Sequence, residues 1–170
     1  MTLAEFNALP PDQAESTLTD CCGSARWASS VSWRRPYATV EELHKVADAI
    51  WWKLERADWL EAFSHHPQIG DKPGSGSASA RQWAAGEQAG ACAASDDVKA
   101  RLAGANRAYF AKFGYLYIVC ATGKTAEAML AILNQRLQND GASELSIAAE
   151  QQRLITRIRL EKLLSAEQRS

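Results

Sequence analysis

One seven-residue stretch decides which fold classes are open to this chain. Residues 115–121, Tyr-Leu-Tyr-Ile-Val-Cys-Ala, are aromatic and β-branched, which is typical of a buried strand. No other segment offers a convincing partner for it, and a lone strand is not stable. We therefore expect a short extended stretch buried between helices. Its backbone N–H and C=O groups need partners other than a sheet, and a polar ligand could be one of them.

The rest of the chain has the patterns of helices. Thr39 and Glu42 form a possible capping box that opens a helix through about residue 55. Two or three short helices are expected within the first thirty residues, and glycines and serines predict a loop over 67–79. Apolar periodicity predicts further helices over about 58–66, 80–94, 96–113, 125–139 and 143–164. The predicted fold is all-α: a single-domain helical bundle over residues 1–170, with about eight helices and one short buried extended segment.

Composition narrows the classes of function. The chain has 170 residues, 46% of them hydrophobic, which fits one domain with a real core. Its net charge of −1 argues against binding of nucleic acid. No apolar run approaches the ~20 residues that a membrane span needs. Residues 1–10 lack the basic start and apolar middle of a signal peptide. We expect a cytoplasmic protein that does not contact membranes.

The four cysteines do not form a redox or zinc motif. The adjacent pair is neither a Cys-x-x-Cys motif nor a metal-ligand spacing. In a cytoplasmic protein we expect all four to be reduced and mostly buried. They stand at positions 21, 22, 92 and 120.

Two of the three histidines are adjacent, His65 and His66, and Pro67 follows them. The proline disfavours helical geometry at His66, so the chain is expected to turn there. Histidine titrates near neutral pH, so an imidazole held at such a turn is suited to proton transfer. We expect that role for His66, and for His65 the role of a cation at a helix C-terminus. A metal site is disfavoured, because no His-x-x-x-His occurs and His44 is the only other imidazole.

Two further candidates have competing interpretations. Glu87 and Gln88 lie in a predicted helix of small residues, between Gly86 and Gly90. Such small residues allow close approach either of a ligand or of another helix. Composition alone does not separate a functional Glu87 from one that faces solvent.

Two of the arginines on the last predicted helix, Arg157 and Arg159, are further candidates. Arg157 has Glu161 four residues on, which predicts a helix ion pair. Arg159 has no such partner and could bind a carboxylate, although spacing alone favours a solvated side chain.

Five motifs occur in order along the chain. They are Arg35-Pro36-Tyr37, Ala62-Phe63-x-x-His66-Pro67-Gln68-Ile69-Gly70-Asp71, Glu87-Gln88-Ala89-Gly90, Asn106-x-x-Tyr109-x-x-Lys112-Phe113-Gly114-Tyr115 and Ile155-Thr156-Arg157-Ile158-Arg159-Leu160. With these motifs in this order, the chain resembles the 2-oxo-4-hydroxy-4-carboxy-5-ureidoimidazoline (OHCU) decarboxylases of urate breakdown. The resemblance covers nearly the whole chain.

The resemblance implies an all-α enzyme, usually a homodimer, that works without a cofactor or metal on a small-molecule substrate. It implies catalytic roles for His66 and Glu87. Many members have serine where this chain has Ala84, so one hydrogen bond of the pocket is absent. Substrate-binding roles are implied for Arg159, for Gln88, for Pro67, which shapes the pocket, and for the backbone at Leu116, Ile118 and Cys120.

The reaction implied is decarboxylation of OHCU to (S)-allantoin in purine breakdown, which makes the chain a carboxy-lyase. Two other classes of function stay open from the residues alone. One is a non-catalytic helical binding module, which predicts solvated side chains at His66, Glu87 and Arg159. The other is a different cofactor-free enzyme that transfers protons through the same histidine.

Overall fold

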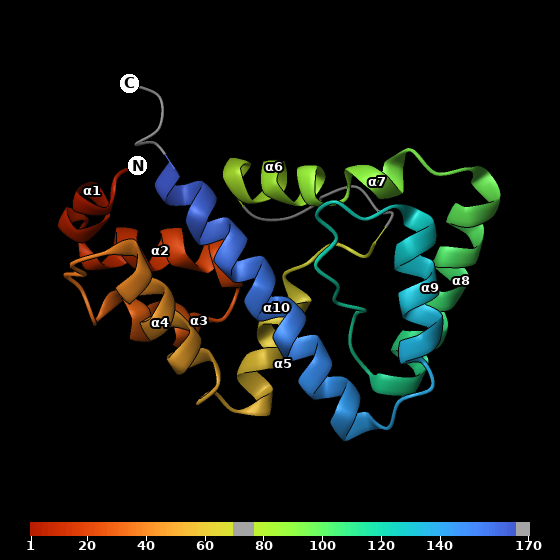
Figure 1. The fold of residues 1–170 in the computed structure, drawn as a ribbon. Helices are drawn as coiled ribbons and strands as arrows, with labels where there is room; N and C mark the ends of the chain where they lie inside the picture. Colours follow the sequence, from red (N-terminus) through yellow and green to blue (C-terminus); the bar gives the residue numbers. More distant parts are fainter. Residues whose placement is uncertain (70–76, 166–170) are drawn as a thin grey trace. The chain divides into compact units, whose positions relative to one another are not determined.

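The computed structural model describes residues 1–69 and 77–165, with only the backbone of Cys92. Within these residues the chain forms ten helices and no strand, and eight of the helices have seven residues or more (Figure 1). The predicted all-α class and the count of about eight helices are confirmed. The helices are α1 (Leu3–Ala8), α2 (Pro11–Cys22), α3 (Ala25–Ser32), α4 (Val40–Trp51), α5 (Arg56–Ser64), α6 (Ala78–Glu87), α7 (Ala89–Cys92), α8 (Asp96–Phe113), α9 (Ala126–Arg136) and α10 (Gly141–Leu164).

Local signals in the sequence set most of these boundaries. The side chain of Thr39 caps α4 by accepting a hydrogen bond from the N–H of Glu42 at 3.1 Å. The side chain of Ser95 caps α8, and Gly114 ends that helix with a φ of +80°, a conformation that favours glycine. The loop predicted over 67–79 is described only at its ends, because residues 70–76 lie outside the described residues.

Four predicted helices end or break earlier than expected, and one of them, predicted over 125–139, ends at Arg136. The helix predicted through residue 55 ends at Trp51, because the N–H of Glu55 donates to the Asp58 carboxylate and so begins α5. α5 ends at Ser64, which leaves both adjacent histidines beyond it. The helix predicted over 80–94 divides at Gln88 into α6 and α7.

The chain divides into two compact units, each described by itself. The first unit comprises residues 1–62 and those from 153 onward. In it α2 packs against α3, and α3 packs against α4. The fully buried side chains of these helices include Leu18, Trp27, Val31, Leu43 and Trp51.

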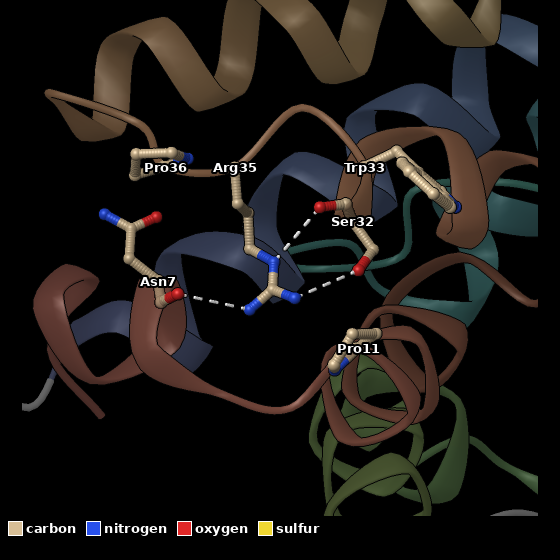
Figure 2. A pocket seen from close by; sticks show the side chains of 6 residues that line it. All are labelled: Asn7, Pro11, Ser32, Trp33, Arg35 and Pro36. Carbon is tan, nitrogen blue, oxygen red and sulfur yellow. Dashed lines mark hydrogen bonds between the residues drawn. The ribbon is translucent and has the colours of Figure 1, made fainter.

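The Arg35-Pro36-Tyr37 motif has a structural role in the first unit. The guanidinium of Arg35 donates to the carbonyls of Phe6 at 2.9 Å, Leu9 at 2.8 Å and Ser32 at 3.1 Å, so it ties α1 to the end of α3. A pocket of about 250 Å³ lies beside this arginine. Figure 2 shows the guanidinium directed at its protein partners, and the pocket is lined by Asn7, Pro11, Ser32, Trp33, Arg35 and Pro36.

The second unit comprises residues 63–152. Figure 1 shows α8 and α9 side by side in it, with the extended stretch between them in the chain. α7 packs against α9, and a Cβ atom added at Gly90 of α7 would lie only 2.1 Å from the Lys124 carbonyl oxygen. Gly90 is therefore needed for close approach of two backbones. α10 begins in this unit and continues beyond residue 152.

No helix among the described residues has both the length and the apolar character needed to cross a membrane.

Candidate active site

His66 lies at the bend after α5, half-buried, and its N–H donates to the carbonyl of Phe63 at 3.2 Å. The neighbouring His65 is exposed. Nε2 of the His66 ring lies 2.7 Å from Oε1 of Gln152, which belongs to α10. The imidazole predicted to transfer protons is therefore held in place by a side chain from a distant part of the sequence.

The partner of this imidazole is itself withdrawn from water. Gln152 is fully buried, at 0% exposure. With its amide oxygen assigned next to the ring, Gln152 accepts and Nε2 of His66 donates. In the neutral imidazole the other ring nitrogen, Nδ1, then carries the lone pair that can accept a proton.

Glu87 and Gln88 occupy the end of α6. Both side chains are buried, each at 8% exposure. The N–H of Gln88 donates to the carbonyl of Ala84 at 3.1 Å, which closes the helix and turns the chain toward α7. Of the interpretations left open by the sequence, a Glu87 that faces solvent is therefore wrong. Burial of a carboxylate is costly unless it is hydrogen-bonded or paired, which is consistent with a functional group.

The extended stretch of residues 115–121 is buried without helix or strand, as predicted, and Leu116 in it is half-buried. Side chains satisfy its backbone groups where a sheet would otherwise do so. The Ile118 carbonyl accepts from Nη1 of Arg136 at 2.6 Å, and the N–H of Cys120 donates to Oε1 of Gln151 at 2.9 Å. The Cys120 carbonyl accepts from Nζ of Lys124 at 2.8 Å. Each carbonyl has a second lone pair that a substrate N–H could still use.

A buried ion pair anchors this stretch. Arg136 of α9 donates through Nε to the Glu144 carboxylate of α10 at 2.7 Å, and Glu144 is 0% exposed. The hydroxyl of Tyr109 donates to the same carboxylate at 2.5 Å. Burial by itself lowers the pKa of Arg136, but the hydrogen bond with Glu144 and the charge interactions with Glu144, Tyr109 and Tyr117 together outweigh it, so the net shift of the pKa is upward. The pair therefore stays charged and holds the Ile118 carbonyl at a fixed place.

Arg159 belongs to the first unit and is buried there, at 6% exposure. Its Nη1 donates to the carbonyl of Asp20 at 3.3 Å. The solvated Arg159 that spacing favoured is therefore wrong. Arg157 does form the predicted helix ion pair with Glu161, at 3.5 Å, and is partly exposed.

The described thiols of the first unit, Cys21 and Cys22, are buried. Burial raises the pKa of the Cys22 thiol to about 12, although a backbone hydrogen bond with Ser24 and a side-chain bond with Thr156 act to lower it. Cys21, like Cys22, is buried outside any disulfide. Among the described residues, no cluster of three or more His, Cys, Asp or Glu side chains is placed to hold a metal ion.

Four residues of this region were not predicted from the sequence: Arg136, Glu144, Gln151 and Gln152. One signal was available for Gln152. It follows the buried Ala148 by four residues and precedes the buried Ile155 by three, so it stands on the buried side of α10. A polar side chain at such a position needs a buried partner. The identity of that partner was not readable from spacing.

Comparisons with known proteins give one answer. The family model described as OHCU decarboxylase matches residues 7–161. The uric acid degradation bifunctional protein TTL of Arabidopsis thaliana is 37% identical over 147 residues, which are 85% of this chain and 45% of that protein. The 2-oxo-4-hydroxy-4-carboxy-5-ureidoimidazoline decarboxylase of Haloferax volcanii is 22% identical over 168 residues, 98% of each protein.

Solved structures agree. A crystal structure of OHCU decarboxylase in the presence of (S)-allantoin matches with a TM-score of 0.77 and 36% identity, and the match covers 88% of this chain and 98% of that one. The all-helical fold of the described residues and the sequence therefore agree on one class of protein. The chain belongs to the OHCU decarboxylase family, as the resemblance of its motifs predicted.

Proposed function

We propose that this chain decarboxylates 2-oxo-4-hydroxy-4-carboxy-5-ureidoimidazoline to (S)-allantoin in the breakdown of urate. The observation that carries the proposal is the family match over residues 7–161. The chain spans nearly the whole Haloferax decarboxylase but less than half of the Arabidopsis bifunctional protein. Burial of Glu87 and Arg159 supports a catalytic function over a binding module, which predicts solvated side chains at these positions.

The chemistry needs a positioned proton donor and acceptor. The substrate carries a carboxylate and a hydroxyl on one ring carbon, next to a carbon in a C=N bond. When the bond to the carboxylate breaks, CO₂ leaves and the electron pair forms a C=C bond, while the C=N pair moves to nitrogen and takes up a proton. The resulting enol gives its hydroxyl proton away and receives a proton on the neighbouring carbon. Delivery to one face of that carbon yields one enantiomer.

We assign the proton transfers to His66, which the proposed mechanism uses as general acid and base. Its half-buried ring and its bond with Gln152 fix the imidazole orientation, which such transfers require. Glu87 orients that ring or accepts from a ring or ureido N–H of the substrate. Pro67 shapes the pocket next to the imidazole, and Gln88 contributes a buried amide beside Glu87.

Substrate binding is assigned to a guanidinium and to backbone groups. Arg159 binds an anionic or carbonyl oxygen of the substrate, for which its planar fork is suited. The ureido amides are assigned to the backbone at Leu116, Ile118 and Cys120, where the carbonyls of the last two are held by Arg136 and Lys124. Because hydrogen bonds already fix these carbonyls, substrate binding costs little further conformational entropy of the backbone, which favours tight and oriented binding.

The product's handedness tests this function. The substrate also decays without enzyme to racemic allantoin, so a loss of substrate by itself proves little. Substrate is generated by coupled oxidation of urate, and circular dichroism is recorded with and without the protein. Optically active (S)-allantoin, formed faster than the background decay, supports the proposal. Racemic product at the background rate rejects it and leaves another proton-transfer enzyme as the alternative.

Two further parts of the resemblance stay predictions: a homodimer and a cytoplasmic location. Sedimentation of the purified chain tests the first, since a monomer at micromolar concentration would contradict it. Localisation of the tagged chain in its own cells tests the second.

A further inference from the structure

One described contact in the second unit that has no assigned role joins His66 to Gln152. The distance of 2.7 Å between Nε2 and Oε1 is short for a hydrogen bond with a ring nitrogen donor. Gln152 is fully buried, and it lies on a helix whose backbone hydrogen bonds fix its position. A buried amide such as this one needs a hydrogen-bond partner, and the His66 ring is one.

We propose that Gln152 is a positioning residue that holds the His66 imidazole as its Nε2–H tautomer, so that Nδ1 exchanges protons with the substrate. The inference rests on the proposed function, because it deepens the role assigned to His66 there. An amide oxygen can only accept, so the nitrogen next to it must carry a proton in the neutral ring. A carboxylate at this position would instead favour the charged imidazolium.

The tautomer also bears on Glu87. Since Gln152 engages Nε2, a carboxylate that oriented the ring would have to contact Nδ1, the nitrogen needed for proton exchange. Of the two roles left open for Glu87, acceptance from a substrate N–H is therefore favoured. In this arrangement the neutral amide of Gln152 orients the His66 imidazole, and the carboxylate of Glu87 binds the substrate.

The residue before Gln152 on α10, Gln151, holds the extended stretch of residues 115–121. Oε1 of Gln151 accepts from the N–H of Cys120, so it holds the extended stretch and not the imidazole. Successive residues of a helix point about 100° apart, which lets two adjacent amides reach two different segments. The pair gives a matched comparison, because Gln151→Leu and Gln152→Leu remove the same chemical group one residue apart.

The test records ¹⁵N–¹H spectra of the full chain labelled at its histidine rings, with His65→Gln and His44→Gln variants used to assign the His66 signals. In the wild type at alkaline pH the proton should lie on Nε2. Gln152→Leu should give a mixture of tautomers, Gln152→Glu should retain Nε2–H because an acceptor oxygen remains, and Gln151→Leu should leave the tautomer unchanged. A proton on Nδ1 in the wild type overturns the proposal, and so does a Gln152→Leu spectrum that matches the wild type.

Kinetics on freshly generated substrate complete the test. Gln152→Leu should lower kcat by about 10–100-fold with little change in KM, by analogy with the loss seen when the hydrogen-bond partner of a metal-bound histidine is removed. Gln152→Glu should recover part of the rate, whereas Gln151→Leu should mainly raise KM. An unchanged kcat in a folded Gln152→Leu overturns the proposal. If Gln152→Leu does not fold, the proposal is tested by the tautomer of His66 in the wild type and by the kcat of Gln152→Glu. Failure of the proposed function would be recognised separately, because the wild type would then give no optically active product.

Discussion

Nε2 of His66 lies 2.7 Å from the amide oxygen of Gln152, across 86 residues of sequence. The orientation of the imidazole is thus fixed by α10, which lies later in the sequence, and not by α5, which His66 follows. Tertiary structure therefore fixes the group on which the proposed chemistry depends.

The first prediction concerns the buried ion pair of Arg136 and Glu144. Replacing Arg136 with Met leaves a buried carboxylate without its charge partner and should lower the free energy of unfolding by about 3–5 kcal/mol. Urea denaturation measures the change. Arg157→Met, which removes a partly exposed pair, is the control and should cost no more than about 1 kcal/mol. Equal effects of the two substitutions would contradict a special role for the buried pair.

The second prediction uses two glycines that differ in their surroundings. Alanine at Gly90 would place its Cβ 2.1 Å from the Lys124 carbonyl oxygen, so Gly90→Ala should destabilise the protein by about 1–3 kcal/mol through overpacking. Gly86 has open space at that position, and Gly86→Ala should stabilise by up to about 1 kcal/mol through helix propensity. Thermal melts of both variants provide the measurement. A neutral Gly90→Ala would show that α7 does not pack as described.

A third prediction concerns alkaline pH. Burial raises the pKa of Cys22 from its ordinary value of 9.0 to about 12 and that of Tyr37 from 10.0 to about 12. Both groups are neutral when protonated, so the folded state holds these protons more tightly than the unfolded state does. The stability they contribute is complete below about pH 9 and is lost as pH rises toward 12.

Urea midpoints measured from pH 7 to pH 11 should therefore fall above about pH 9. Cys22→Ala should make that fall shallower, whatever its effect on stability at neutral pH, because one proton-linked group has been removed. Iodoacetamide at pH 8 should leave Cys22 of the folded protein unmodified. Rapid alkylation of Cys22 under native conditions would contradict its burial.

Substitution of Arg159 tests substrate binding. Lysine keeps the charge but not the planar fork, so Arg159→Lys should lower kcat/KM by about 10–100-fold, the loss of one charged hydrogen bond. Arg157→Lys is the matched control two residues away, and it should change kcat/KM less than 2-fold because Arg157 is partly exposed and paired with Glu161. An unchanged KM and kcat in Arg159→Lys would remove this residue from the substrate site.

What the sequence predicted well depends on short-range chemistry. The helix predicted over 96–113 has these bounds in the structure, because the capping side chain of Ser95 and the left-handed Gly114 act within a few residues of its ends. The buried extended stretch was recognised from composition alone. The family followed from several short motifs in order, and it is confirmed by the match over residues 7–161.

What the sequence did not predict depends on contacts between distant residues. Arg159 was judged by its neighbours three and four positions away, but its described acceptor is the carbonyl of Asp20, 139 residues earlier. The helix predicted over 80–94 divides at Gln88, and the α7 that follows packs closely on the backbone at Lys124 through Gly90. No pattern within one helix contains such information, and the partner of His66 was missed for the same reason.

The handedness of the product made by His66→Ala tests the central claim most directly. The matched control is His65→Ala, since His65 is exposed and carries no assigned role. With substrate from coupled urate oxidation, the wild type and His65→Ala should give (S)-allantoin by circular dichroism. His66→Ala should lose about 10²–10⁴-fold in rate and give essentially racemic product from background decay. Optically active (S)-allantoin formed by His66→Ala at the wild-type rate would contradict the account.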